Sequence, residues 1–135
     1  NAATAEGAEG KTALSIAVHA LSGEISTRRG NLDEGITHFR EAANIEDKGL
    51  YFEPPKWYYP IRHSLGAALI QAGQHAEAER VYREDLRRFP ENGWSLFGLS
   101  QTLRAQGKST DAGATDARFR RAWADTDVTL TASRF

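Results

Sequence analysis

Apolar residues recur along the middle of this chain at the spacing of amphipathic helices, with an interruption at a glycine. Before Gly73, one helical face carries Leu65, Leu69 and Ala72, at positions i, i+4 and i+7. After it, a second run of the same kind carries Ala78, Val81, Tyr82 and Leu86. The pattern predicts two helices joined by a tight turn, because each run covers one face of a 3.6-residue period.

This helix pair is repeated along the chain. A shift of 34 residues maps Leu65 onto Leu99, Leu69 onto Leu103, Gly73 onto Gly107 and Ala78 onto Ala112. A shift of 43 residues maps Gly23 onto Gly66, Gly30 onto Gly73 and Phe39 onto Tyr82. The sequence therefore contains three copies of a helix–turn–helix unit, with nine additional residues between the first copy and the second.

Glycines and capping residues mark the expected ends of the helices. Gly30, Gly73 and Gly107 lie where a helix C-terminus favours a left-handed residue. Side-chain caps are expected from Asn31 with Glu34 as a capping box, from Asn92 and from Ser109. The first helices are expected at about 11–29, 55–72 and 92–106, and the second at about 31–46, 75–89 and 109–124. The sequence thus predicts an all-α fold of three helical hairpins.

The stretch YFEPPKWYYPIRHSLG, residues 51–66, combines prolines with a dense group of aromatic residues. Proline is favoured in the first turn of a helix, so Pro54-Pro55 predicts a helix start near residue 55. Trp57 and Tyr58 then lie in an additional first turn. Two interpretations stay open: these rings cover the end of the preceding helix pair, or they contact a ligand as well.

The second copy carries the residues of a family resemblance. Its period of 34 residues resembles the tetratricopeptide repeat, on the positions Gly66, Ala78, Tyr82 and Pro90. The first copy has Gly23 and Phe39 at the small and aromatic positions. The third copy departs from the family pattern, because Ser100 replaces the glycine and Asp116 stands where an aromatic residue is usual.

The resemblance implies a right-handed α-solenoid of three hairpins with a C-terminal capping segment. It covers residues 13–124, with repeats at about 13–47, 55–90 and 91–124. Residues 1–12 are expected to be a flexible N-terminal segment or an expression scar, and residues 125–135 a C-terminal cap. The last helix carries apolar residues that need cover, and the tail residues expected to supply it are Val128, Leu130 or Phe135.

Longer strings, from LSGEI at residues 21–25 to LTASRF at the end, also resemble the C-terminal part of a longer bacterial tetratricopeptide-repeat protein without an assigned activity. That likeness implies further repeats upstream in a parent chain and adds no chemistry. Residues 1–12 lack the apolar core of a signal peptide. The compartment therefore stays open between bacterial cytoplasm and periplasm.

Composition and motifs exclude several classes of function. The formal net charge of −1 gives no global basic field for nucleic acid or an anionic membrane, and no apolar run is long enough to span a bilayer. The absence of cysteine removes thiolate nucleophiles and cysteine zinc ligands. The four histidines lack the spacing of metal ligands on one helix face, and Glu84 and Asp85 are interpreted as solvated charges. We therefore expect no catalytic residue, no metal and no cofactor.

In tetratricopeptide-repeat proteins the first helices line a concave groove where peptides bind, and the resemblance implies the same here. The residues expected to contact a partner are Glu24, Arg28, Trp57, Tyr58, His63, Phe97, Gln101 and Arg104. The predicted function is a non-enzymatic interaction module for a protein or peptide segment with an apolar anchor and an acidic group. Two alternatives stay open: a structural cap that packs on upstream repeats of the parent chain, and a self-association module that forms a homodimer.

Overall fold

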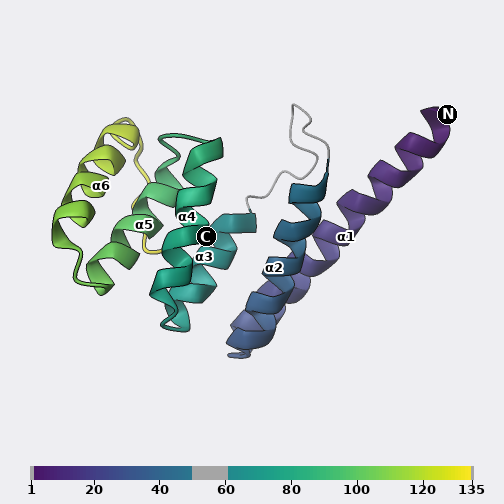
Figure 1. Ribbon diagram of the computed structural model, residues 1–135, viewed down its shortest axis with the longest axis horizontal. Coiled ribbons are helices and arrows are strands. Elements are labelled where there is room, and N and C mark those ends of the chain that lie inside the picture. Colours follow the sequence, from purple (N-terminus) through teal and green to yellow (C-terminus); the bar gives the residue numbers. More distant parts are fainter. Residues whose placement is uncertain (1, 50–60, 135) are drawn as a thin grey trace. The chain divides into compact units, whose positions relative to one another are not determined.

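The computed structural model describes residues 2–49 and 61–134, and all regular secondary structure in that part of the chain is helical (Figure 1). Within these residues, six helices follow one another and pair as hairpins, which confirms the predicted all-α fold. The chain divides into two compact units, Asn1–Ile61 and Arg62–Phe135.

The first unit is a hairpin of α1 (Ala2–Arg28) and α2 (Leu32–Lys48). Phe39 is fully buried, and its ring lies so close to Gly23 that an added Cβ there would come within 2.7 Å of Phe39 Cε1. A glycine at this position therefore lets the two helices approach closely. α1 begins well before the expected start near residue 11, because the preceding segment is rich in alanine and glutamate, which have high helix propensity.

One face of α1 is apolar and exposed. The four residues of this α1 stripe and their exposed fractions are Leu14 at 65%, Val18 at 54%, Leu21 at 63% and Ile25 at 42%. Their spacing of i, i+4, i+7 and i+11 places them along one line of the helix. The buried residues of the same helix, such as Ile16 and Ala20, lie on a different face.

The second unit contains two hairpins, α3 (Ile61–Gln71) with α4 (His75–Arg88), and α5 (Gly93–Ala105) with α6 (Ser109–Ala122) (Figure 1). Tyr82 of α4 is fully buried between the backbones of Gly66 on α3 and Gly98 on α5. An added Cβ would come within 2.3 Å of Tyr82 Cζ at Gly66 and within 2.2 Å at Gly98. The packing of these three helices therefore depends on the missing side chain at both glycines.

The third repeat replaces this glycine–aromatic contact with a polar one. Ser100 Oγ donates a hydrogen bond to Asp116 Oδ1, and Arg104 Nη2 donates to the other carboxylate oxygen of Asp116. The two departures from the family pattern therefore compensate each other, because serine and aspartate occupy the positions of the glycine and the aromatic ring.

The turns inside the hairpins have the predicted glycine conformation. Gly30, Gly73 and Gly107 have φ angles of 86°, 75° and 76°. At each turn the glycine N–H and the next N–H bond back to carbonyls of the last helical turn; for example, Gly73 N donates to Ile70 O and Gln74 N to Leu69 O. This pair of bonds is the Schellman motif, and it closes the helix.

The predicted side-chain caps are confirmed at one helix start and wrong at two. Asn92 accepts a hydrogen bond from Ser95 N at 3.3 Å, with extended backbone at ψ 115°. Asn31 precedes α2 without a side-chain cap bond, and Lys108 rather than Ser109 holds the cap position of α6. Asn31 and Lys108 each end a Schellman turn, with ψ angles of 69° and 64°. These angles depart from the extended conformation that side-chain capping uses.

The predicted start of the third helix near residue 55 lies outside the described residues, as do Trp57 and Tyr58. The described part of α3 begins at Ile61. The division into an N-terminal segment, a repeat domain and a C-terminal cap, with the boundaries given above, stays a prediction.

We expect Gly98→Ala to lower the free energy of unfolding by about 1–3 kcal/mol, the usual effect of overpacking a closed core. The Tyr82 ring cannot move aside, because Gly66 closes its other face. The matched control is Gly113→Ala on α6, where an added Cβ meets nothing within 4 Å. There the better helix propensity of alanine is expected to stabilise the chain by about 0.5–1 kcal/mol. Urea unfolding measures both changes, and equal effects at the two glycines would contradict the packing of Tyr82.

Candidate functional site

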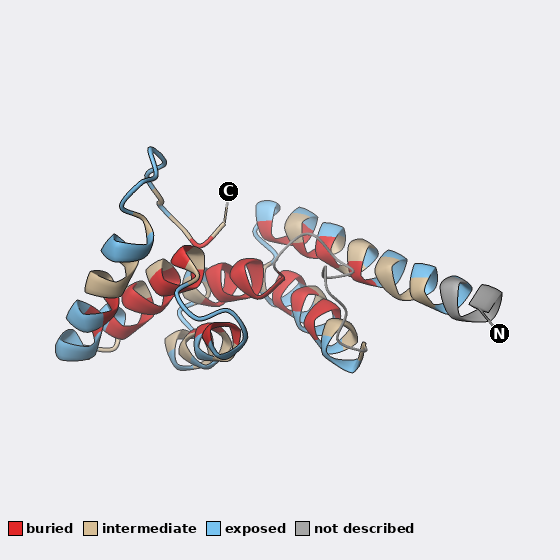
Figure 2. Cartoon of the chain, turned by 90° about the horizontal axis from the view of Figure 1, so that it is seen from above, coloured by how far each residue is buried: buried red, intermediate tan, exposed pale blue. Residues whose placement is uncertain are grey.

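The second unit has a surface that we call the first-helix face: the side of α3 and α5 that points away from α4. Tyr82 extends from α4 between Gly66 and Gly98, so its hydroxyl group reaches this face. In Figure 2, the residues after α6 return over the same side of the first helices. The C-terminal tail, residues 125–134, therefore covers part of the first-helix face without forming a helix or strand from residue 126 onward.

Ser133 fixes the tail to this face. Its side chain is fully buried, and Ser133 Oγ donates a hydrogen bond to the backbone oxygen of His63 at 2.7 Å. Ser133 Oγ also lies 2.6 Å from the Tyr82 hydroxyl oxygen. Since a serine hydroxyl has one proton, Tyr82 donates the second hydrogen bond and Ser133 accepts it. Burial raises the pKa of Tyr82, so its hydroxyl keeps the proton that this bond requires.

The tail is also held at its beginning. Trp123 Nε1 donates a hydrogen bond to Val128 O at 2.6 Å, and the indole ring packs against Gly93, where an added Cβ would come within 2.3 Å of the ring. The expected apolar cap is wrong for Val128, which is 50% exposed, and Leu130 is only half-buried. Phe135 lies outside the described residues. A polar anchor, Ser133, takes the buried place because its hydroxyl finds two partners there.

A second buried polar cluster lies next to this anchor. The His63 side chain is buried, with Nε2 at 3.1 Å from Asp85 Oδ2, and Ser95 Oγ donates to the same carboxylate oxygen at 2.5 Å. The hydroxyl of Ser95 bonds to the carboxylate and not to the imidazole, so the histidine is not placed to activate it as a nucleophile. The cluster links α3, α4 and α5 through side chains.

Asp85 corrects the interpretation of adjacent carboxylates as solvated. Glu84 is partly exposed and pairs with Arg87, whereas Asp85 is 5% exposed on the apolar face of α4. Burial by itself would raise the pKa of Asp85, but the hydrogen bonds from His63 and Ser95 outweigh it and hold the pKa below its usual value. Asp85 is therefore a buried carboxylate that its partners keep ionised.

Aromatic rings continue from this cluster across the second unit. The ring contacts run from His63 to Trp94 at 6.5 Å, from Trp94 to Trp123 at 5.6 Å, from Trp123 to Phe119 at 5.7 Å and from Phe119 to Phe97 at 5.5 Å between centroids. The row connects α3, α5 and the end of α6, where the tail begins. The row of rings therefore connects Trp123, at the start of the tail, with His63, whose carbonyl oxygen binds Ser133.

The structure brings together some of the residues predicted to contact a partner. Phe97, Gln101 and Arg104 follow one another at i, i+4 and i+7 on α5, and each has exposed surface. Phe97 touches Phe119, and the Arg104 side chain, 61% exposed, pairs with Asp116. His63 differs, because its side chain is buried against Asp85 and its carbonyl oxygen faces the tail.

The remaining predicted contact residues belong elsewhere. Glu24 and Arg28 lie in the first unit, where they form an ion pair at 3.8 Å between adjacent turns of α1. Trp57 and Tyr58 lie outside the described residues. The assignment of all eight residues to partner binding stays a prediction.

Over residues 2–49 and 61–134, no group of three or more histidine, cysteine or acidic side chains could hold a metal ion. His19 and His38 face each other across α1 and α2, with 3.1 Å between their Nδ1 atoms, a distance at which one proton is shared as a hydrogen bond. No helix in the described part of the chain has the length and apolar character needed to cross a membrane.

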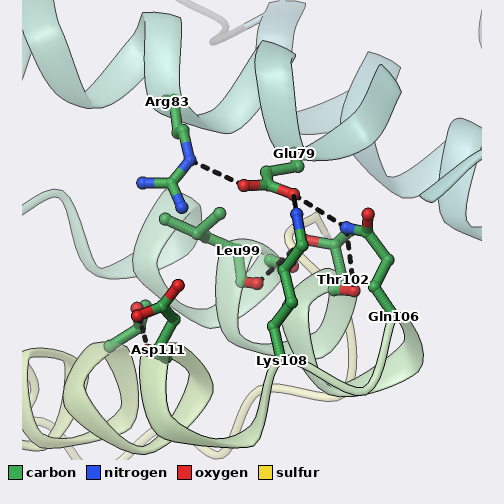
Figure 3. A network of polar contacts seen from close by, with 9 residues as sticks. Glu79, Arg83, Leu99, Thr102, Gln106, Lys108 and Asp111 are labelled. Carbon is green, nitrogen blue, oxygen red and sulfur yellow. Dashed lines mark hydrogen bonds and ion pairs between the residues drawn. The ribbon is translucent and has the colours of Figure 1, made fainter. Parts of the chain in front are cut away.

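The second unit also has a charged network at the turn between α5 and α6 (Figure 3). Glu79 of α4 accepts hydrogen bonds from Lys108 at 2.7 Å, from Arg83 at 2.9 Å and from Gln106 at 2.8 Å. The hydrogen bond from Lys108 is the main cause that lowers the pKa of Glu79, and burial opposes it; the result is a pKa of about 2. The network ties α4 to the following hairpin.

Comparisons with known proteins agree with this architecture. The sequence model of the tetratricopeptide repeat matches residues 60–84, which include α3, most of α4 and the Gly66–Tyr82 contact. Over 92 residues, or 68% of this chain, the sequence is 29% identical to the human protein named Tetratricopeptide repeat protein 7A. The chain spans about a tenth of that relative, 10% of its length. Together with the helical hairpins, these findings show that the chain is similar to tetratricopeptide-repeat proteins.

Sequence reasoning missed Ser133, Asp85 and Trp94 as parts of the site. Asp85 could have been found, because it follows Ala78 and Tyr82 at i+7 and i+3 and so shares their apolar face. Ser133 carries no such signal, since it lies in a non-periodic tail and its partners are 51 and 70 residues away.

We expect Glu79→Gln to lower the free energy of unfolding at pH 7 by about 1 kcal/mol, the scale of partly exposed ion pairs. The folded-state pKa of about 2 lies below the ordinary 4.5, so the charge stabilises the fold above about pH 4.5, and this contribution is lost as the pH falls toward 2. Urea unfolding at several pH values should therefore show the two proteins converging near pH 2. Glu41→Gln, at an exposed position of α2, is the control; a difference for Glu79→Gln that stays constant with pH would contradict the assignment.

Proposed function

We propose that the second unit is a non-enzymatic interaction module that binds an extended segment of a partner protein on its first-helix face. The observation that carries the proposal is the tail: residues 125–134 lie on this face without regular structure, and a side chain of the tail is fully buried there. A face that accepts one non-helical segment has the shape and the hydrogen-bonding groups to accept another. Tetratricopeptide repeats in general mediate protein–protein interaction, which agrees with this role.

Three exposed or half-exposed side chains of α5 supply the further contacts in this proposal. Phe97 offers apolar surface, and Gln101 offers an amide that both donates and accepts hydrogen bonds. Arg104 is 61% exposed and already pairs with the Asp116 carboxylate, so an acidic group of a partner has a cation within reach. The ligand that fits is therefore a segment with an apolar anchor and an acidic side chain.

The scaffold is formed before the partner arrives, which favours binding. Tyr82 is held between two glycine backbones, and His63 is held by Asp85, so neither needs to be ordered by a ligand. The chain's own tail opposes binding, because a partner has to displace it from the first-helix face. Binding through this face is therefore a competition between two segments for one surface.

The test uses peptides selected from a random display library on the full chain, with affinity measured by titration calorimetry. We expect Phe97→Ala combined with Arg104→Gln to weaken a selected peptide at least about tenfold, because the apolar anchor and the cation are removed together. Arg87→Ala is the control, since that side chain is 76% exposed on α4. Unchanged affinity in the double variant, with helicity intact, would contradict binding along α5.

The α1 stripe favours self-association as a second candidate function. Its four exposed apolar residues have the alternating spacing of four and three residues that helices use to pair, and a second copy of this chain offers the same stripe. We expect the sedimentation coefficient of the chain to rise with concentration, and Val18→Glu with Leu21→Glu to abolish that rise. Glu41→Lys on α2 is the control; a wild-type chain that stays monomeric at all concentrations would eliminate this candidate.

A further inference from the structure

The Ser133 anchor has the geometry of a binding subsite. Its two partners come from the folded helices: the Tyr82 hydroxyl at 2.6 Å and the His63 carbonyl oxygen at 2.7 Å. The Ser133 side chain between them has no exposed surface. We call these two groups, the Tyr82 hydroxyl and the His63 carbonyl oxygen, the hydroxyl subsite.

The hydrogen-bonding groups of the subsite define what can enter it. The His63 carbonyl only accepts, so the entering group has to donate a proton to it. Tyr82 then uses its own proton to donate to the entering group, which has to accept. A serine hydroxyl does both with one oxygen. Alanine does neither, and a fully ionised carboxylate or phosphate has no proton to give to the carbonyl.

The subsite is held in place by the packing of the second unit. The Tyr82 ring is fixed between Gly66 and Gly98, so its hydroxyl has one position. The residue that provides the carbonyl is fixed through its own side chain, which bonds to Asp85 and stacks on Trp94. Because both groups are positioned by the fold, the subsite does not require the tail in order to form.

We propose that the first-helix face selects extended partner segments by a serine hydroxyl that enters this subsite, and that Ser133 of the chain's own tail occupies it until such a segment displaces it. This inference rests on the proposed function and narrows it to a ligand class. The residue after the serine also has a partner, because Arg134 Nη2 lies 3.5 Å from Gln71 Oε1 of α3. The ligand class is therefore an unstructured segment with an unphosphorylated serine followed by a basic residue.

The first experiment measures peptide binding to the full chain carrying Ser133→Ala, whose own tail has lost its anchor. The probe is a fluorescent peptide with the sequence of residues 125–134, in versions with serine, alanine or phosphoserine at the position of Ser133. We expect the serine peptide to bind about tenfold more tightly than the alanine peptide, since alanine leaves the buried Tyr82 hydroxyl without its acceptor and removes the donor to the His63 carbonyl. The phosphoserine peptide should bind no better than the alanine peptide. A peptide with alanine in place of Thr131, which is exposed in the tail, is the control and should bind like the serine peptide.

The second arm removes one group of the subsite while the fold stays intact. In the chain with Tyr82→Phe and Ser133→Ala, the ring still fills the space between the glycines, and the preference for the serine peptide should shrink toward parity. Circular dichroism confirms folding of both proteins. Equal binding of the serine and alanine peptides to the Ser133→Ala chain would overturn the subsite and leave the proposed function standing. A serine preference that survives Tyr82→Phe in full would overturn it as well.

A third arm covers the case in which no peptide binds. Heteronuclear NMR relaxation of residues 126–134 reports whether the chain's own tail is ordered. If Ser133→Ala mobilises the tail and Thr131→Ala does not, the subsite is supported as an internal lock and only the proposed binding of a partner fails. If the tail stays equally ordered in both variants, the hydroxyl does not hold it, and the proposal is overturned.

Discussion

The Tyr82 ring between two glycine backbones is the contact on which the second unit depends. It fixes the spacing of α3, α4 and α5 at once, because the ring fills the gap that missing side chains leave at Gly66 and Gly98. The first unit uses the same arrangement with Phe39 and Gly23. The same packing places the Tyr82 hydroxyl at the first-helix face. The core therefore supplies a polar group to the surface where the tail lies.

Polar groups around this core are satisfied in ways that connect separate parts of the chain. Ser133 bonds to Tyr82 and to the carbonyl of His63, while the His63 side chain bonds to Asp85. A buried polar group without a hydrogen-bond partner destabilises the fold. Each of these side chains is therefore constrained to the position in which it meets its partner. The third repeat follows the same logic with Ser100 and Asp116 in place of the glycine and the ring.

The helices and their turns could be predicted from the sequence because they depend on local spacing and on the backbone freedom of glycine. Gly73 and Gly107 are examples, since a left-handed residue is required where each helix ends. The cap at Asn31 was predicted wrongly because the preceding Schellman turn sets its backbone away from the extended conformation. The site could not be predicted as a whole, because the burial of Ser133 depends on partners far away in the sequence and on no periodic pattern.

The chain's own tail occupies the first-helix face through Ser133. A nuclear Overhauser spectrum of the wild-type chain in solution tests this contact. We expect cross-peaks between the Ser133 β-protons and the Tyr82 ring protons next to its hydroxyl, together with dispersed amide shifts for residues 126–134. Random-coil shifts for these residues, with no cross-peak to Tyr82 in a chain that is otherwise folded, would contradict it.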